Sequence, residues 1–335
     1  MRRHNSRFLV LAVTGIILFL LLAGCTGLQV PGKKTVYIVY GSEKGDLSYT
    51  DSAYAGLQRA EQEMGVRTRE FTPTDYQEIP ALLNATPDAE KPGLIITVGF
   101  QYADFSRTIA AQHPEIGVLA IDQAGNGTDN LQVYEITSYG DSYLAGALAA
   151  SATRTGRIGI IMGMKTELLD TFIQGYRDGA RAVNASIVVD PAYVHEDSVT
   201  GFTDPERAES IAEAMYRNGT DVIFVGAGIS NTGVFSAATT TPGRYVIGTD
   251  ADQSPLGPGF ILASAMKRVD RVVYSGISAY ANGTFAGGNR VAGLKEGVTG
   301  IVYNPEFAYY EKTVSAWERA AETGEQEFLL NRSGK

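Results

Sequence analysis

Short apolar runs that alternate with helical segments constrain the fold of this chain more than any other feature. In the first half, the predicted strands are Thr35–Tyr40, Val66–Phe71, Gly93–Val98 and Gly117–Asp122. The helices predicted between them are Asp51–Met64, Ile79–Ala85 and Tyr102–Gln112. Continuous apolar strands separated by helices are typical of a parallel sheet that is covered on both faces. The first half is therefore predicted to be an α/β unit.

The same alternation begins again in the second half. The predicted strands are Arg157–Met162, Ser186–Tyr193, Val222–Val225, Tyr245–Gly248 and the strand-like run Phe260–Ala265. The predicted helices are Ser142–Thr153, Leu168–Val183, Pro205–Asn218 and Thr232–Ala238. Two units of this kind predict an α/β protein with two doubly wound lobes. Two lobes whose strand ends face each other form a cleft suited to a small ligand.

The loops that follow the strands supply candidate ligand-binding residues, because the functional loops of right-handed βαβ units lie at the carboxyl ends of the strands. They are Asp46, Asp51, Gly99, Phe100, Asp122, Gly226 and Asp250. Asp250 is favoured for ligand binding, since a carboxylate can accept two hydrogen bonds from vicinal hydroxyls. Asp252 is expected to cap a turn, because the glycine and distal glutamate of a calcium loop are missing.

The glycine-rich segment 226–233 is expected to form a tight turn. It lacks the third glycine of a dinucleotide site and the lysine of a phosphate loop. Its backbone can still face a ligand.

Charge and composition exclude several functions. The net charge is −9, and without Arg2, Arg3 and Arg7 it would be −9 − 3 = −12, which disfavours nucleic-acid binding. The single cysteine allows neither a disulfide framework nor a thiolate metal site. Apart from His4, the only histidines are His113 and His195, and neither accompanies a nucleophile or metal motif. We expect no enzyme, cofactor or metal, although paired carboxylates leave a hydrolase open.

The N-terminus has the composition of an export signal. A basic start at 1–7 is followed by the uncharged run Phe8–Leu22 and by Leu-Ala-Gly-Cys at 22–25. These four residues resemble the lipobox of lipoprotein signals. We therefore expect a signal peptide at 1–24, lipidation of Cys25, a tether at 25–34 and an extracytoplasmic protein anchored to the cell membrane. An uncleaved membrane anchor is the alternative, and whether the Asn-x-Ser/Thr sites are glycosylated stays open.

Several ordered motifs resemble the basic membrane protein family, the lipoprotein receptors related to the purine nucleoside receptor of spirochaetes. The motifs lie at 46–57, 94–100, 113–122, 142–146, 175–179, 247–253 and 264–268, within a resemblance that runs from about Thr35 to Lys312. Each is short, but their order and spacing together are specific.

The resemblance implies a type I periplasmic binding protein fold and delivery of a ligand to an ABC permease. It assigns 35–134 plus 266–290 to one lobe and 135–265 plus 291–335 to the other, joined by a hinge that the chain crosses three times. A monomer is expected. A ligand sensor of the same fold that signals to a membrane partner remains the alternative.

The resemblance also implies roles in the cleft. Tyr49 takes the position of a stacking aromatic, and Phe172 would stack from the other lobe unless it is a core aromatic. Asp46, Thr50 and Asp122 would bind donors on the edge of a purine, while Asp250 and Lys267 would hold ribose hydroxyls near the Gly226 backbone. Leu47 stands where the family often has lysine, and Thr50 replaces an asparagine. A different small hydroxylated or heterocyclic ligand therefore stays open.

Overall fold

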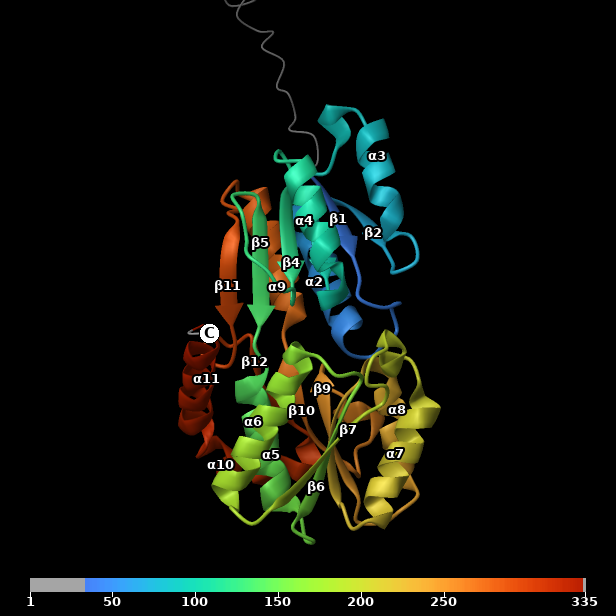
Figure 1. Cartoon of the computed structure of the whole chain (residues 1–335), viewed down its shortest axis with the longest axis vertical. Helices are drawn as coiled ribbons and strands as arrows, with labels where there is room; N and C mark the ends of the chain where they lie inside the picture. The colour runs from blue at the N-terminus through green and yellow to red at the C-terminus, as the bar shows by residue number, and fades with distance from the viewer. Residues whose placement is uncertain (1–33, 334–335) are drawn as a thin grey trace, which may run out of the picture. The chain divides into compact units, whose positions relative to one another are not determined.

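The computed structural model describes residues 34–333, which contain two six-stranded sheets (Figure 1). The first sheet has the order β11-β5-β4-β3-β1-β2 and is parallel throughout. Its strands are β1 (Thr35–Val39), β2 (Arg67–Phe71), β3 (Leu94–Val98), β4 (Gly117–Ile121), β5 (Leu131–Ile136) and β11 (Gly288–Ala292). The predicted signal peptide and the predicted lipidation site Cys25 lie outside the described residues.

The second sheet has the order β12-β10-β9-β8-β6-β7. It is parallel except for the pair β10 and β12, which run antiparallel. Its strands are β6 (Arg157–Met162), β7 (Val188–Tyr193), β8 (Val222–Gly226), β9 (Tyr245–Asp250), β10 (Ile261–Lys267) and β12 (Thr299–Tyr303). The predicted α/β class with two parallel-dominated sheets is confirmed.

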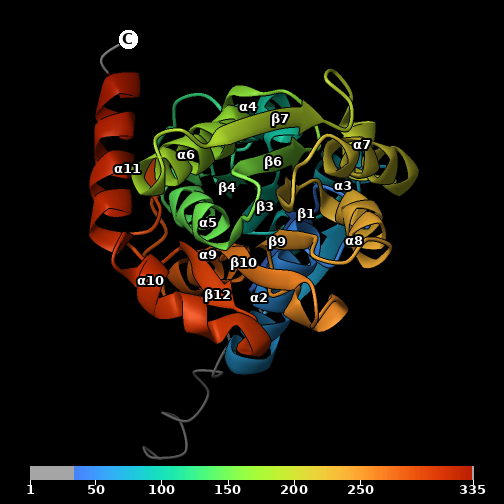
Figure 2. The ribbon, with the colours of Figure 1, turned by 90° about the horizontal axis from the view of Figure 1, so that it is seen from below.

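Helices cover both faces of each sheet (Figures 1 and 2). We call the first sheet with α2, α3, α4 and α9 the first lobe, and the second sheet with the remaining helices the second lobe. The first-lobe helices are α2 (Tyr49–Met64), α3 (Ile79–Ala85), α4 (Ala103–Gln112) and α9 (Val269–Ala281). Those of the second lobe are α5 (Tyr139–Ala152), α6 (Glu167–Val183), α7 (Pro205–Arg217), α8 (Asn231–Thr239), α10 (Glu311–Ser315) and α11 (Glu318–Ser333).

Each sheet separates two hydrophobic cores, which explains why its strands are apolar at successive positions. In β1, Val36 and Ile38 enter the core beneath α2 and α9, whereas Tyr37 and Val39 enter the core beneath α3 and α4. Neighbouring residues of a strand point to opposite faces, so a strand buried on both faces needs apolar residues throughout. No helix among residues 34–333 has the length and apolar character required to cross a membrane.

The chain passes between the lobes three times, at places that differ slightly from the predicted lobe boundaries. Strand β5 continues in the first sheet to Ile136, and β11 pairs with it as far as Ala292. Met266 and Lys267 were assigned to the first lobe, but they belong to β10 in the second sheet, where Lys267 pairs with Thr299. Strand pairing sets these limits, and a pairing partner that lies far along the chain is not visible in the local sequence.

Glycines allow α5 and α6 to pack with their backbones in contact. A Cβ added at Gly146 of α5 would lie 2.0 Å from the Tyr176 carbonyl oxygen, and one at Gly179 of α6 would lie 1.9 Å from that of Tyr143. At Gly175 it would lie 2.2 Å from the Tyr139 carbonyl oxygen. The motifs at 142–146 and 175–179 therefore serve the packing of α5 against α6. This contact lies close to the point where the chain first passes from one lobe to the other.

We expect Gly179→Ala to lower the free energy of unfolding by roughly 1–3 kcal/mol, because the new methyl group meets rigid backbone. The gain in helix propensity is at most about 1 kcal/mol and offsets only part of this cost. Urea denaturation followed by circular dichroism measures the effect. Gly259→Ala is the matched control, since a Cβ there has nothing within 4 Å. Equal midpoints for the two variants would contradict the packing argument.

Candidate ligand-binding site

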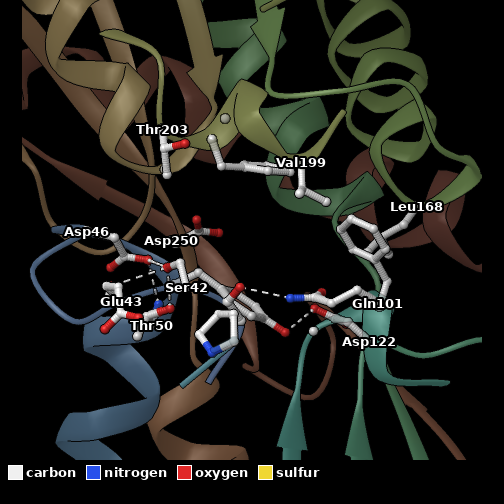
Figure 3. A pocket seen from close by; sticks show the side chains of 18 of the residues that line it. Ser42, Glu43, Asp46, Thr50, Gln101, Asp122, Leu168, Val199, Thr203 and Asp250 are labelled. Atoms are coloured by element: carbon white, nitrogen blue, oxygen red, sulfur yellow. Dashed lines mark hydrogen bonds between the residues drawn. The ribbon is translucent and has the colours of Figure 1, made fainter. Parts of the chain in front are cut away.

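The carboxyl ends of both sheets line one cavity of about 550 Å³ (Figure 3). Every predicted ligand-binding residue except Asp51 lines it. These are Asp46, Tyr49, Thr50, Gly99, Phe100, Asp122, Phe172, Gly226, Asp250 and Lys267. Both lobes contribute, so the site is assembled from segments more than 200 residues apart in the chain. The cavity lining shows where these residues lie. That each of them binds a ligand remains a prediction.

A buried ion pair joins the lobes at the base of the cavity. Lys267 Nζ lies 2.5 Å from Asp122 Oδ2, and the two side chains are 3% and 2% exposed. The same Oδ2 accepts a hydrogen bond from the Tyr49 hydroxyl at 2.9 Å, and Oδ1 accepts one from the Ile136 amide at 2.9 Å. Desolvation and the adjacent Asp122 carboxylate raise the pKa of Tyr49 well above its ordinary value. Tyr49 therefore stays a neutral donor.

One aromatic ring from each lobe lies close to this lysine. Lys267 Nζ is 5.5 Å from the centroid of the Tyr49 ring and 5.7 Å from that of Phe172. Phe172 is also a core residue, with its ring 6.4 Å from Phe224. Phe172 thus combines the two alternatives left open by the sequence, because it packs in the second lobe and still lines the cavity.

Asp250 makes a second contact between the lobes. Ser48, from the first lobe, donates a hydrogen bond from its Oγ to Asp250 Oδ2 at 2.6 Å. Burial raises the pKa of Asp250 to about 6, although the charge of Lys267 and the Ser48 hydrogen bond partly oppose this shift. Gln253 adds a further link by donating from Nε2 to the Leu47 carbonyl at 3.0 Å. Neither Ser48 nor Gln253 was predicted as a site residue.

Both aspartates that line the cavity at strand ends, Asp122 and Asp250, have an unusual backbone conformation. Asp122 and Asp250 follow β4 and end β9, and their φ angles of 59° and 66° are in the left-handed region. This region is unfavourable for residues other than glycine, and such strain is often found at functional sites. Gly99 follows β3 in the same way and has a φ of 124°. Glycine adopts positive φ angles without steric cost, because it has no Cβ.

Two predicted roles need correction. Asp51 lies outside the cavity lining, and its carboxylate accepts hydrogen bonds from the amides of Gly45 (2.7 Å) and Leu47 (2.9 Å). Asp46 lines the cavity but braces the same loop, with its oxygens accepting from the amides of Ser48, Thr50 and Asp51. These short-range bonds occupy the lone pairs that the resemblance assigned to a base edge. Both carboxylates hold the start of α2 in place.

Thr50 is buried and its hydroxyl lies 2.7 Å from the Ser42 hydroxyl, within the same loop. It therefore lines the cavity with one of its hydrogen-bonding positions already used within the loop. Phe100 meets Phe202 of the second lobe, with ring centroids 6.4 Å apart. Phe202 and Val199 also line the cavity and were not predicted, because they lie in a turn, Val199–Phe202, between β7 and α7 rather than at a strand end.

The two histidines considered for catalysis or metal binding, His113 and His195, do not line the cavity. His195 Nε2 is 2.9 Å from Asp204 Oδ2. Within residues 34–333, no group of three or more His, Cys, Asp or Glu side chains is placed to hold a metal ion.

We expect Lys267→Met to lower the free energy of unfolding by about 3 kcal/mol or more, because it leaves the buried Asp122 carboxylate without its cation. Chemical denaturation at neutral pH measures this loss. The control is Lys44→Met, which removes a more exposed ion pair with Glu70 and should cost at most about 1 kcal/mol. Similar midpoints for both variants would show that the Asp122–Lys267 pair does not hold the structure together.

A family model described as ABC transporter substrate-binding protein PnrA-like matches residues 33–323. The chain is 31% identical to basic membrane protein A1 of Borrelia garinii subsp. bavariensis, over 91% of this chain and 90% of that protein. It is also 31% identical to the ABC transporter nucleoside-binding protein BmpA of Lactococcus lactis subsp. cremoris, over 86% and 89% respectively.

A solved structure of an ABC transporter solute-binding protein from Aeropyrum pernix K1 is similar to this fold. It has a TM-score of 0.72 and 30% sequence identity, with 87% of this chain and 80% of that chain covered. The family model, the sequence relatives and the fold agree with one another. The chain therefore belongs to the basic membrane protein family of PnrA-like ABC transporter substrate-binding proteins.

Proposed function

We propose that this chain binds a purine nucleoside in the cavity between its lobes and delivers it to an ABC permease. The observation that carries the proposal is the pair of aromatic rings, one from each lobe, beside a carboxylate-rich polar floor. Tyr49 and Phe172 both line the cavity, where an aromatic ring can contact a base, and Asp250 can accept hydrogen bonds from sugar hydroxyls. The printed name of the Lactococcus relative, a nucleoside-binding protein, supports this ligand class.

The charges of the cavity favour an uncharged ligand that donates hydrogen bonds. Among its lining residues are four carboxylates, Glu43, Asp46, Asp122 and Asp250, whereas Lys267 is the one cation. Lys267 is already paired with Asp122 at 2.5 Å. A phosphate group would therefore meet like charges with no cation available to it, so nucleotides should bind far more weakly than nucleosides.

The remaining parts of the proposal concern the whole protein. We propose that the three crossings between the lobes form a hinge, and that closure around the ligand is what the permease recognises. Cleavage before Cys25 and lipidation of its thiol would hold a monomeric receptor on the outer side of the cell membrane. The ligand is proposed to leave chemically unchanged.

A thermal-shift panel of nucleosides, nucleobases, sugars, amino acids and nucleotides tests the ligand class. We expect inosine, guanosine or adenosine to stabilise the purified chain, by about 2.7 kcal/mol at a hundredfold excess over Kd. A shift with sugars or amino acids and none with these nucleosides would overturn the proposal. Chromatography of the recovered ligand should show no product, and conversion of the nucleoside would indicate an enzyme.

Asp250→Ala should abolish ligand stabilisation while leaving the unliganded protein folded, because it removes the proposed acceptor of the sugar hydroxyls. The matched control is Asp197→Ala, an exposed aspartate of the second lobe that does not line the cavity. Isothermal titration with the best nucleoside of the panel compares the two variants. Unchanged affinity in Asp250→Ala would remove this residue from the site.

Binding should weaken as the pH falls through about 6, because Asp250 then becomes protonated and loses an acceptor. At pH 5 only about one molecule in ten would carry the ionised form, so Kd should be roughly tenfold higher than at pH 7. Ser48→Ala removes a hydrogen bond that favours the ionised form. It should move the midpoint of the pH profile upwards, and an unchanged midpoint would exclude Asp250 as the titrating group.

A further inference from the structure

Six asparagines of this chain stand in the acceptor pattern for N-linked sugars, in which a serine or threonine follows two residues later. They are Asn84, Asn126, Asn184, Asn218, Asn282 and Asn331. The chain has 11 asparagines, and 47 of its 335 residues are serine or threonine, so chance would place only about one or two asparagines in the pattern. The hydroxyl residues are therefore enriched at this position.

The asparagines outside the pattern hold the structure together through their side-chain nitrogens. Within residues 34–333 they are Asn130, Asn231, Asn289 and Asn304, and each donates at least one hydrogen bond from Nδ2. Asn304, for example, is 2% exposed and donates to the carbonyls of Pro258 at 2.8 Å and Ile261 at 2.7 Å. These asparagines serve the fold.

The six asparagines of the pattern have different surroundings, since all of them are exposed. Within residues 34–333, five of them donate no hydrogen bond from Nδ2, and Asn282 donates only to Ser278 Oγ at 3.4 Å. At Asn184, the hydroxyl and the amide of Ser186 donate to Oδ1 at 2.8 Å and 3.0 Å. The side-chain oxygen is thus engaged, while the nitrogen, to which a sugar would be joined, faces solvent.

The positions of the six asparagines leave the cavity open, because none of them lines it. Asn84, Asn184, Asn218 and Asn282 lie at the carboxyl ends of α3, α6, α7 and α9. These helices return the chain to the amino ends of the strands, whereas the cavity lies at the carboxyl ends (Figure 1). Asparagine often ends helices, but this preference does not explain a hydroxyl two residues later.

We propose that these six asparagines are sites of N-linked glycosylation outside the cytoplasm. The donor is a sugar carried on a lipid phosphate. Asn Nδ2 forms a bond to C1 of the sugar, the bond from C1 to the phosphate oxygen breaks, the lipid phosphate leaves with that electron pair, and the amide proton passes to solvent. The inference goes beyond ligand binding and requires only the proposed export of the chain.

Thr220, two residues after Asn218, shows when this site is modified. Thr220 is buried, and its hydroxyl has no hydrogen-bond partner within residues 34–333. Burying a hydroxyl without a partner is costly, so the hydroxyl does not serve the folded structure. Recognition of this hydroxyl while the chain is still unfolded accounts for it, and Asn218 is then modified before folding.

Peptide mass spectrometry tests the proposal on the chain purified from the membranes of the cells that naturally produce it. We expect a sugar on each of the six asparagines and none on Asn289, which is exposed but is followed two residues later by Val291. Loss of residues 1–24, measured on the N-terminal peptide, reports separately on export. Six unmodified asparagines overturn the inference whether or not these residues have been removed.

Two substitutions at an exposed residue test the role of the hydroxyl. Ser186→Ala should remove the sugar from Asn184 and leave the other five, whereas the matched control Ser186→Thr should keep all six. A sugar that remains on Asn184 in Ser186→Ala would contradict the proposal. Nucleoside affinity should be the same in both variants, because Asn184 does not line the cavity. Failure of nucleoside binding would therefore leave the glycosylation result unaffected.

Thr220→Val tests the site that is modified before folding. It should leave Asn218 without a sugar, because valine lacks the hydroxyl that the acceptor pattern requires. The thermal unfolding midpoint should not fall, since a methyl group of similar size replaces an unpartnered hydroxyl. A sugar retained on Asn218 in this variant would also overturn the inference.

Discussion

The buried pair between Lys267 and Asp122 is the interaction on which the site depends. Lys267 ends β10 of the second sheet, and Asp122 follows β4 of the first, so their contact fixes how the two strand ends meet. Removing charges from water is costly unless they are paired with good geometry. The pair satisfies this requirement by using the one cation among the lining residues. The other lining carboxylates, Glu43, Asp46 and Asp250, have no further cation among the lining residues.

Strain and hydrogen bonding prepare the cavity before a ligand arrives. Asp122 and Asp250 both adopt left-handed backbone conformations, and each is held there by a bond to a residue from another segment. Asp122 accepts from the Ile136 amide, and Asp250 accepts from Ser48 across the cleft. Groups that are already oriented cost less entropy to order when a ligand binds. The Ser48–Asp250 bond also connects the two lobes, whereas the bond from Ile136 to Asp122 lies within the first lobe.

Much of the fold could be predicted from the sequence, because strands buried on both faces and helices between them leave strong local patterns. Strands β5, β11 and β12 were not predicted. In β11, most side chains are exposed, and β5 alternates buried with partly exposed residues, so neither shows a continuous apolar run. Ten of the eleven predicted site residues line the cavity, and their binding roles stay predictions. The carboxylate of Asp46 also accepts hydrogen bonds within its own loop, which no strand-end pattern indicates.

By itself, the sequence determined the α/β rhythm and the acidic charge. The close contact of α5 and α6 at Gly146, Gly175 and Gly179 became visible only in the structure. Only the tertiary structure decided which carboxylates remain available, since Asp46 and Asp51 are engaged within their loop while Asp250 faces the cavity. It also decided that Phe202 and Val199 line the cavity. The physical reason is that burial, pKa and hydrogen bonding at the site depend on segments about 200 residues apart, such as Ser48 and Asp250, which no local pattern relates.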